Sequence, residues 1–287
     1  MAVNQRWISV LFYLGLALIN CRHTQLEPVS SSPGGRVSSL GLCWSGDKSP
    51  ENLFGFLPSL FREGGEALVR VVSEGWSCEG VLILYRGEIV PLFASHCLSF
   101  KRDTDTVELR LAVYFEHPLL GQDNDERWRE GYIFPAAKRF ANLPVTSLKF
   151  DKNLDLAYVR GLFPSGLPAG HRALTLTSTA PRAGDLVMGF HRHTFKWYEE
   201  DSVTGIARTS EADVLTPNFG FFIGVTDHLY AFFFPSFKGD SGSSILNHQK
   251  QVIGIVWKTL AGKRGKIETL AIRTPYIVAF FEATWDQ

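Results

Sequence analysis

The segment Gly239-Asp240-Ser241-Gly242-Ser243 is the strongest candidate for chemistry in the sequence. A nucleophilic serine needs an exposed hydroxyl on a tight turn, with backbone N–H groups near enough to hold a developing oxyanion. Glycines on both sides of Ser241 allow such a turn and let a substrate backbone approach closely. The same residue types are common in ordinary polar β-turns, so the segment alone does not establish a nucleophile.

Two other segments hold side chains that could activate such a serine. The first, Phe93-Ala94-Ser95-His96-Cys97, has a histidine after an apolar run, where a general base could be held rigidly. An isolated histidine is more often a buried structural residue, so that alternative stays open. In the second, Asp155 lies inside the strand-like run Leu154–Arg160. A buried carboxylate is costly unless it is paired, and orienting an imidazole is one such pairing. Asp151, just before this run, is expected to be solvated.

The candidates occur in the order His96, Asp155 and Ser241, with spacings of 59 and 86 residues. The chain resembles the chymotrypsin/trypsin-like serine peptidases, whose marks are a small residue before His-Cys, an Asp-Leu-Ala segment and Gly-Asp-Ser-Gly. The resemblance covers about residues 65 to 285. Two further segments, Ser243–Asn247 and Val252–Val256, are similar to the strand pair after the nucleophile in bacterial glutamyl-endopeptidase-like members.

The resemblance implies an all-β fold of two six-stranded antiparallel barrels, with the active site between them and a helix at the C-terminus. It also implies a serine endopeptidase that hydrolyses a protein or peptide substrate through an acyl-enzyme, with no metal and no organic cofactor. Ser241 would attack the scissile carbonyl, His96 would transfer the proton, and Asp155 would orient the imidazole. The N–H groups of Gly239 and Ser241 would form the oxyanion hole.

A disulfide bond and a substrate pocket are implied as well. Cys78 begins a segment similar to the family's Cys-Gly-Gly strand, whose cysteine pairs with the one after the histidine, here Cys97. Alignment from the nucleophile puts the pocket floor near Pro235, where an acidic residue would favour Lys or Arg in the substrate. Trypsin-like specificity is therefore not expected. The other expected substrate-binding residues are Lys238, Trp257, Lys258 and Thr259.

Some features depart from the family's pattern. Zymogen-type members begin the mature chain with Ile/Val-Val-Gly-Gly, whose amino group pairs with the Asp before the serine. The stretch from Arg36 to Leu40 is a poor match, so activation by cleavage is not expected and the partner of Asp240 stays open. His191 and His193 form a His-x-His pair that could bind a metal, but a solvated hairpin tip is the expected setting.

Two other functions compete with a peptidase. A protease-shaped protein could keep the fold and work by binding or adhesion at the cell surface. Such proteins usually lose a triad member, whereas all three candidates are present here. An esterase of the α/β-hydrolase type needs Gly-x-Ser-x-Gly between strand and helix, with the order Ser, acid, His, which is the reverse of the order in this chain.

The elements that must position these residues are mostly short strands. In Val107–Phe115 apolar residues alternate with other residues at the two-residue period of a half-buried strand. A C-terminal helix is expected from Thr274 as N-cap and Pro275 in the first turn. The other short apolar runs read as strands: Leu68–Val72, Val81–Tyr85, Ile89–Ala94, Leu154–Arg160, Leu186–Phe190, Tyr230–Phe234, Ser243–Leu246, Val252–Trp257 and Thr269–Ile272.

Composition sets the remaining limits. The chain has 287 residues, 45% of them apolar, with 29 basic and 29 acidic residues. No Lys/Arg run or basic stripe stands out, so nucleic acid is not an expected partner. Residues 44–287 are expected to form one peptidase domain, with the boundary between its half-barrels in the Pro/Gly-rich stretch near residues 161–170.

The first residues resemble an export signal. Arg6 supplies a basic start, and Trp7–Ile19 is a mostly apolar run too short to cross a bilayer. We expect a signal peptide over residues 1–21 and a flexible tether over residues 22–43, in an exported protein that is secreted, periplasmic or membrane-anchored. Leu18-Ile19-Asn20-Cys21 resembles a bacterial lipobox, and a lipid on Cys21 would be the one contact with a membrane. Cleavage without lipid is the equal alternative.

Overall fold

The computed structural model describes residues 59–73, 76–98, 105–116, 130–134, 139–200, 207–234, 236, 239–261 and 267–287. All of them belong to one compact unit, Lys48–Gln287. The expected signal peptide, the tether, Cys21, Pro235 and Lys238 lie outside the described residues. In the described ranges, no helix has the length and apolarity needed to span a membrane.

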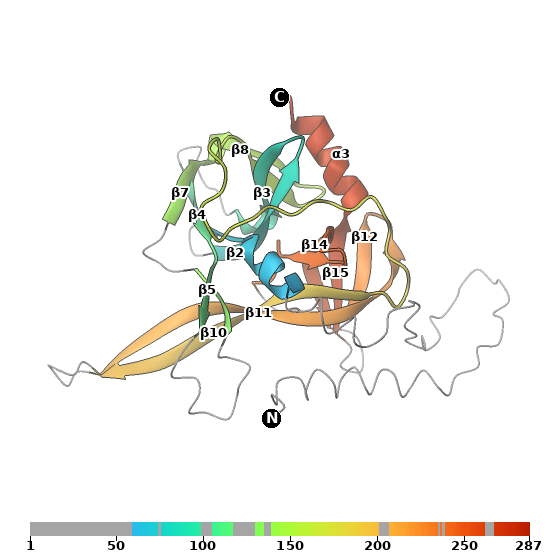
Figure 1. Cartoon of the computed structure of the whole chain (residues 1–287). Helices are drawn as coiled ribbons and strands as arrows, with labels where there is room; N and C mark the ends of the chain where they lie inside the picture. Colours follow the sequence, from blue (N-terminus) through green and yellow to red (C-terminus); the bar gives the residue numbers. More distant parts are fainter. Residues whose placement is uncertain are drawn as a thin grey trace, which may run out of the picture. The chain divides into compact units, whose positions relative to one another are not determined.

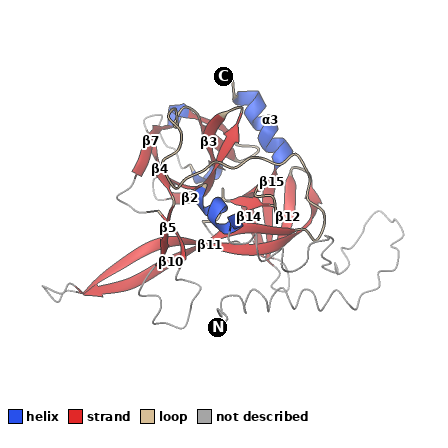
Figure 2. Ribbon diagram, viewed as in Figure 1, coloured by secondary structure: helices blue, strands red, loops and turns tan. Residues whose placement is uncertain are grey.

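The first sheet is antiparallel and curls on itself (Figures 1 and 2). Its strand order is β7-β4-β1-β2-β3-β9-β8. The two edge strands, β7 and β8, follow each other in the chain and are joined by a single 3₁₀ turn, η4 (Val145–Ser147). One bent segment therefore pairs with β4 at one end and with β9 at the other, which closes the sheet into a barrel. The strands are β1 (Leu68–Ser73), β2 (Trp76–Tyr85), β3 (Glu88–Ala94), β4 (Thr106–Leu111), β7 (Arg139–Pro144), β8 (Leu148–Asp151) and β9 (Leu156–Val159).

The interior of this barrel is an apolar cluster to which every strand contributes. Strand side chains alternate between the two faces of a sheet, so one set of positions points inward. The buried cluster contains Val69, Val71, Leu82, Phe93, Val107, Leu109, Leu143, Leu148, Ala157 and Val159. Burial of these β-branched and large apolar side chains is the main favourable term in forming the barrel.

The second sheet has eight strands in the order β10-β13-β14-β15-β12-β11-β6-β5. A further pairing between β10 and β11 closes six of them into a ring, and β5 and β6 continue the sheet from β11. The interior cluster includes Phe222, Phe232, Phe234, Ile245 and Ile253. The strands are β5 (Val113–Glu116), β6 (Glu130–Ile133), β10 (Leu186–Glu200), β11 (Ala207–Thr226), β12 (Leu229–Phe233), β13 (Ser244–Leu246), β14 (Val252–Ala261) and β15 (Ile267–Arg273).

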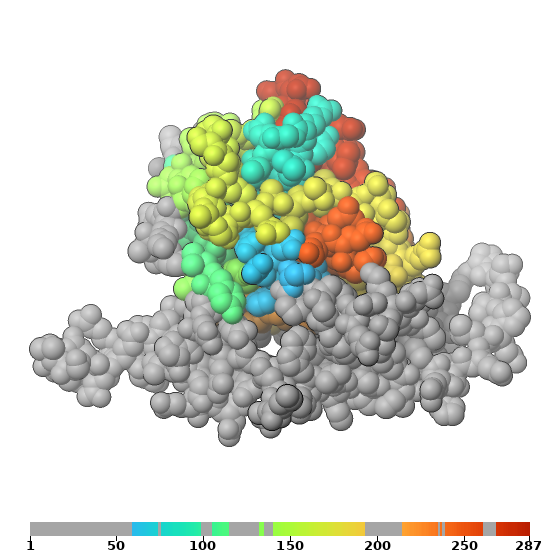
Figure 3. Space-filling view, in the orientation of Figure 1, coloured from blue at the N-terminus to red at the C-terminus, as the bar shows by residue number. Residues whose placement is uncertain are grey.

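The connection from β9 to β10 runs over both sheets and binds each of them. It appears in yellow across the front of the molecule in Figure 3. Leu174 forms an isolated bridge with Ile83 of β2, and Leu176 forms one with Val252 of β14. The stretch near residues 161–170 belongs to this connection. This connection, called the strap, therefore bridges the two barrels through backbone hydrogen bonds.

The C-terminal helix α3 (Thr274–Thr284) packs against the first barrel. Phe280 and Phe281 lie edge-on to Tyr158 of β9, with ring centroids 5.3 and 4.9 Å apart. Burial raises the pKa of the Tyr158 hydroxyl, which is hydrogen-bonded to Thr284 Oγ1. The N-cap lies one residue earlier than expected: Arg273 is the N-cap, and Thr274, the expected cap, is the first residue of the helix. The Thr274 hydroxyl donates to the Ile253 carbonyl.

The predicted fold class, all-β with two barrels and a C-terminal helix, is confirmed. One strand prediction is wrong, because it treats two strands as one. The run Val107–Phe115 is two strands, because the chain leaves the first sheet at Ala112 and enters the second. Ala112 makes its own backbone bonds, donating to Leu68 and accepting from His171. Alternation continues through this crossing, so the pattern alone does not reveal it.

Candidate active site

His96 and Asp155 form a closely bonded pair. His96 lies in the 3₁₀ turn η1 (Ser95–Cys97) that follows β3, and its Nδ1 is 2.5 Å from Asp155 Oδ2. The backbone N–H of His96 donates to Asp155 Oδ1 at 2.7 Å, and the Ser95 hydroxyl donates to the same oxygen at 2.9 Å. Asp155 is buried whereas the His96 side chain is 47% exposed. The carboxylate is therefore fixed, and the imidazole keeps part of its surface open to solvent.

Asp155 sits at the end of a turn rather than inside a strand. Residues 152–155 form the turn between β8 and β9, and Asp155 has φ of 58°. Aspartate tolerates this left-handed conformation better than most residues. The conformation is held because the Asp155 carbonyl accepts from the Ser95 N–H at 3.1 Å while the carboxylate binds His96. The expected position within the strand run Leu154–Arg160 is therefore corrected by one residue, since β9 starts at Leu156.

The loop that carries Ser241 is bonded to both barrels. The Ser241 carbonyl accepts from the N–H of Glu79 on β2 at 3.1 Å, and the Gly242 N–H donates to Val256 of β14 at 2.8 Å. Gly242 has φ of +88°, and a Cβ there would lie 2.0 Å from the Glu79 carbonyl oxygen. Only glycine fits this close approach. The loop is thereby wedged between β2 and β14.

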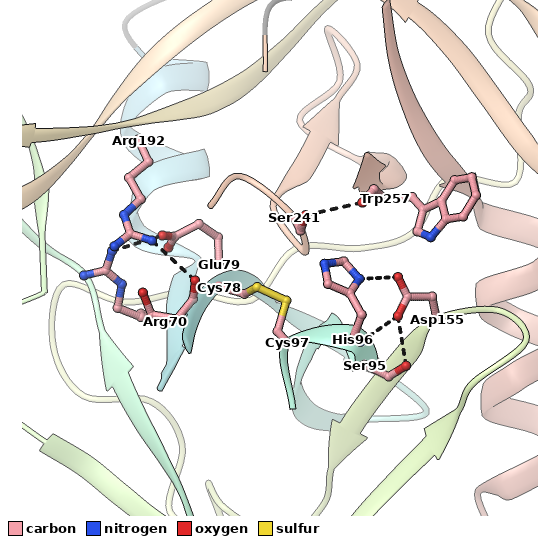
Figure 4. The surroundings of a disulfide bond; sticks show 11 residues. Arg70, Cys78, Glu79, Ser95, His96, Cys97, Asp155, Arg192, Ser241 and Trp257 are labelled. Atoms are coloured by element: carbon pink, nitrogen blue, oxygen red, sulfur yellow. Dashed lines mark hydrogen bonds and ion pairs between the residues drawn. A yellow bond between two sulfur atoms is a disulfide. The ribbon is translucent and has the colours of Figure 1, made fainter. Parts of the chain in front are cut away.

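The hydroxyl of Ser241 is hydrogen-bonded to a backbone carbonyl. Figure 4 shows the His96 imidazole between Asp155 and Ser241, with the ring nitrogen not bonded to Asp155 on the side of Ser241. In the described part of the chain, Ser241 Oγ donates to the Trp257 carbonyl at 3.3 Å and not to His96. Trp257 is the extra residue of a bulge between β14 and β15. The bulge leaves its carbonyl outside the strand ladder, where it meets Ser241.

A disulfide bond links the two parts of this site. Cys78 on β2 is bonded to Cys97 at the end of η1, with their Cα atoms 5.8 Å apart. Cys78 precedes Glu79, which binds the Ser241 backbone, and Cys97 follows His96. The two sulfur atoms and the His96 ring form a cluster compact enough for a metal ion, but sulfurs joined in a disulfide are not the thiolates that bind metals.

Asp240 has a protein partner that the sequence left open. Its carboxylate is fully buried, with Oδ2 2.9 Å from His191 Nδ1 and Oδ1 2.9 Å from the backbone N–H of Arg192. His191 is itself buried within β10. The expectation that His191 lies at a solvated hairpin tip is wrong, because it satisfies a buried carboxylate. The side chain of His193 lies outside the described residues.

The expected substrate-binding residues fall at different places. Trp257 faces Ser241 through its carbonyl, and the exposed Lys258 places its ammonium 4.0 Å from the centroid of the Trp257 ring. The Thr259 hydroxyl points away toward Ser236, to which it is hydrogen-bonded. Ser236 is buried and also bonds Thr269, so these three hydroxyls form a polar cluster.

Sequence reasoning missed three residues of the site. In the sequence, Ser95 was noted only as a small residue before the histidine. In the structure, its hydroxyl donates to Asp155. His191 and Arg192 lie 49 and 48 residues before Asp240. Their signal in the sequence is indirect: the sequence left the partner of Asp240 open, and a buried carboxylate requires a donor somewhere in the chain.

Comparisons with known proteins found similar structures but no similar sequences. No protein-family model matches the sequence, and no curated protein matches it in sequence. One similar structure is a serine-to-alanine mutant of the protease Rv3671c from M. tuberculosis H37Rv in its inactive form. It has 12% identity and a TM-score of 0.47, covering 80% of this chain and 94% of that one. A second structure of that protease in its inactive form has 12% identity and a TM-score of 0.45, covering 79% and 95%. A serine endoprotease from Yersinia pestis has 15% identity and a TM-score of 0.49, covering 79% of this chain and 65% of that one.

Proposed function

We propose that this chain, whose fold is the two-barrel fold of chymotrypsin-like serine peptidases, is a serine endopeptidase with His96, Asp155 and Ser241 as its triad. One observation supports this most: a histidine bonded through Nδ1 to a buried carboxylate has its opposite edge toward a serine in a constrained loop. A histidine that served only the core would be buried, yet His96 is about half exposed. An exposed base next to a serine is the arrangement that acyl transfer needs.

The proposed proton path follows from the tautomer of His96. Because Nδ1–H donates to Asp155, Nε2 carries the lone pair and can accept the proton of Ser241. Ser241 Oγ then forms a bond to the substrate carbonyl carbon. His96 passes the proton to the leaving amine as the C–N bond breaks, which leaves an acyl-enzyme. Water attacks the acyl-enzyme by the same route in reverse, and Ser241 is regenerated.

The negative charge of the tetrahedral intermediate would be held by the backbone N–H groups of Gly239 and Ser241. Removal of one such donor in a related site type costs about 10²–10³ in rate. The Asp155 carboxylate would stabilise the imidazolium formed in the same step, and its two other donors, Ser95 Oγ and His96 N, keep it oriented. Before attack, the Ser241 hydroxyl has to leave the Trp257 carbonyl and turn toward His96.

The substrate class proposed is an extended segment of protein or peptide. Trp257 and Lys258 flank the serine and would contact the residues next to the cleaved bond. The disulfide between Cys78 and Cys97 supports export as the setting, because such bonds persist in oxidising compartments. We therefore keep secretion, the periplasm or a lipid-anchored form as the proposed location.

A fluorophosphonate probe tests the proposal directly, because it reacts with an activated serine. The full chain should label, and Ser241→Ala should not. Ser178→Ala is a matched control, since Ser178 is exposed in the connection between the barrels and should label as the wild type does. Circular dichroism establishes that each protein is folded. A folded wild-type protein that does not label would contradict the peptidase and favour a protease-shaped binding protein.

A further inference from the structure

Asp240 is the residue that determines how the loop before Ser241 is held. Its carboxylate is 0% exposed, and consecutive residues of β10 supply two donors to it. His191 Nδ1 is 2.9 Å from one oxygen, and the Arg192 N–H is 2.9 Å from the other. A buried carboxylate left without donors is strongly unfavourable, because it has lost its hydration and gained nothing in return. These contacts therefore fix the direction of the Asp240 side chain.

Arg192 also restrains Gly239. A Cβ on Gly239 would lie 2.8 Å from an Nη atom of Arg192, so the guanidinium lies directly against this glycine. Arg192 then reaches β2, where its Nη1 donates to the Ser77 carbonyl at 3.3 Å. Figure 4 shows the Arg192 side chain extending toward Glu79 and Arg70. His191 and Arg192 thus hold the loop at two successive residues.

This position matters because Asp240 lies between the two proposed oxyanion donors. The Ser241 N–H belongs to the peptide unit that joins Asp240 to Ser241, and the Gly239 N–H lies one residue before. Rotation of the Asp240 backbone would change the direction of the Ser241 N–H relative to that of Gly239. An oxyanion hole works only when its donors are preorganised within hydrogen-bond distance of the developing charge.

We propose that His191 is a positioning residue of the proposed peptidase: it holds Asp240 so that the N–H groups of Gly239 and Ser241 point at the oxyanion. The inference rests on the proposed function and adds to it. Because the donors come from β10, the loop is held by residues internal to the folded chain. The site should therefore be competent without a newly cleaved N-terminus to hold Asp240.

The test compares three substitutions of His191 in the full chain. His191→Asn places an amide nitrogen where Nδ1 sits, so the donor to Asp240 is kept. His191→Gln places the amide one carbon farther, near the position of Nε2, and His191→Leu has no donor. His171→Leu is the matched control: this partly buried histidine bonds the Ala112 carbonyl at 2.9 Å, in the strap between the barrels.

The readout is the inactivation of each protein by the fluorophosphonate probe over a range of concentrations. This gives the maximal rate kinact separately from the probe affinity KI. The phosphoryl oxygen of the probe needs the same N–H donors, so kinact reports their placement. We expect His191→Leu and His191→Gln to lower kinact about 10–100-fold, somewhat less than loss of one oxyanion donor, with KI changed only a few-fold. His191→Asn should stay within about five-fold of the wild type, and His171→Leu should match it.

Each outcome decides the question. Wild-type kinact in His191→Leu would overturn the inference while leaving the proposed function intact. Equal losses in His191→Asn and His191→Gln would overturn it too, because the donor at Nδ1 would then be irrelevant. If His191→Leu does not fold, the comparison of the Asn and Gln variants, which both carry an amide in place of the imidazole, still decides. A folded wild type that does not label overturns the proposed function, and this inference with it.

Discussion

Replacing Gly242 by alanine should be the most damaging single-atom change in the loop that carries Ser241. The new Cβ would lie 2.0 Å from the Glu79 carbonyl oxygen and 2.9 Å from the Ala94 backbone nitrogen. Both neighbours are backbone atoms of the first barrel, so no side chain can move aside to make room. The carbonyl would have to retreat by about 1.4 Å to restore ordinary contact. That movement would disturb the bond by which the Glu79 N–H holds the Ser241 carbonyl.

The expected loss of stability has two parts. An alanine at φ of +88° costs about 1–2 kcal/mol for the left-handed conformation. Relief of the overlap adds about 1–3 kcal/mol, the usual cost of overpacking a close-packed region. Gly166→Ala separates the two parts. Gly166 has φ of +85°, and a Cβ at this position would meet no atom within 4 Å, so only the conformational cost should remain.

Urea unfolding followed by tryptophan fluorescence measures both variants against the wild type. We expect Gly242→Ala to lose about 2–5 kcal/mol and Gly166→Ala about 1–2 kcal/mol, with equal m-values. Fluorophosphonate labelling should also slow in Gly242→Ala and remain unchanged in Gly166→Ala. Equal losses in the two variants would refute the reasoning, because they would mean that the loop is not wedged against β2.

Two other outcomes are expected. Asp155→Asn should slow hydrolysis or labelling by roughly 10⁴-fold, because the amide no longer fixes the His96 tautomer. The control variant Asp151→Asn should label normally. A similar rate in both variants would exclude Asp155 from the triad. Burial acts to raise the pKa of Glu88, but its hydrogen bonds and the charge of Arg160 outweigh burial and lower it. The stabilisation is therefore present above the unfolded pKa of 4.5 and lost as pH falls through the lower folded value. Glu88→Gln should lower the free energy of unfolding by about 0.2–1 kcal/mol at neutral pH and leave it unchanged at about pH 2. Urea unfolding at each pH measures this difference. A difference that stays constant with pH would contradict the prediction.

The local motifs of the site could be predicted because each is a short stretch of sequence. The turn at Ser241 needs glycines on both sides, and the residues around it are the ones that fit. Asp155 was identified by the cost of burying a carboxylate, which holds whether it lies in a strand or a turn. Its left-handed conformation was not predictable, because it depends on Ser95 and His96, about 60 residues away.

Long-range pairing limited the prediction of the fold. Alternation identified the segment that contains β4 and β5, but alternation is the same on both sides of Ala112. Which sheet a strand joins depends on partners such as β7 and β6, and these lie later in the chain. The role of His191 was hidden for the same reason. A histidine in a β-strand has no pattern of its own until the fold places Asp240 beside it.

The contacts between the barrels fix the backbone of the site, so the proposed mechanism needs only one movement before attack. Glu79 N–H holds the Ser241 carbonyl, Gly242 is pressed against the Glu79 carbonyl, and the disulfide from Cys78 ties the same strand to the turn of His96. The spacing between the serine and the histidine is therefore set by backbone contacts of β2 and not by their side chains. What remains is rotation of the Ser241 hydroxyl from the Trp257 carbonyl to His96. Breaking a hydrogen bond of this kind costs about 0.5–1.5 kcal/mol, and the new bond returns a similar amount. In the proposed mechanism this step is thus nearly neutral in free energy, and the barrier lies in the attack on the carbonyl.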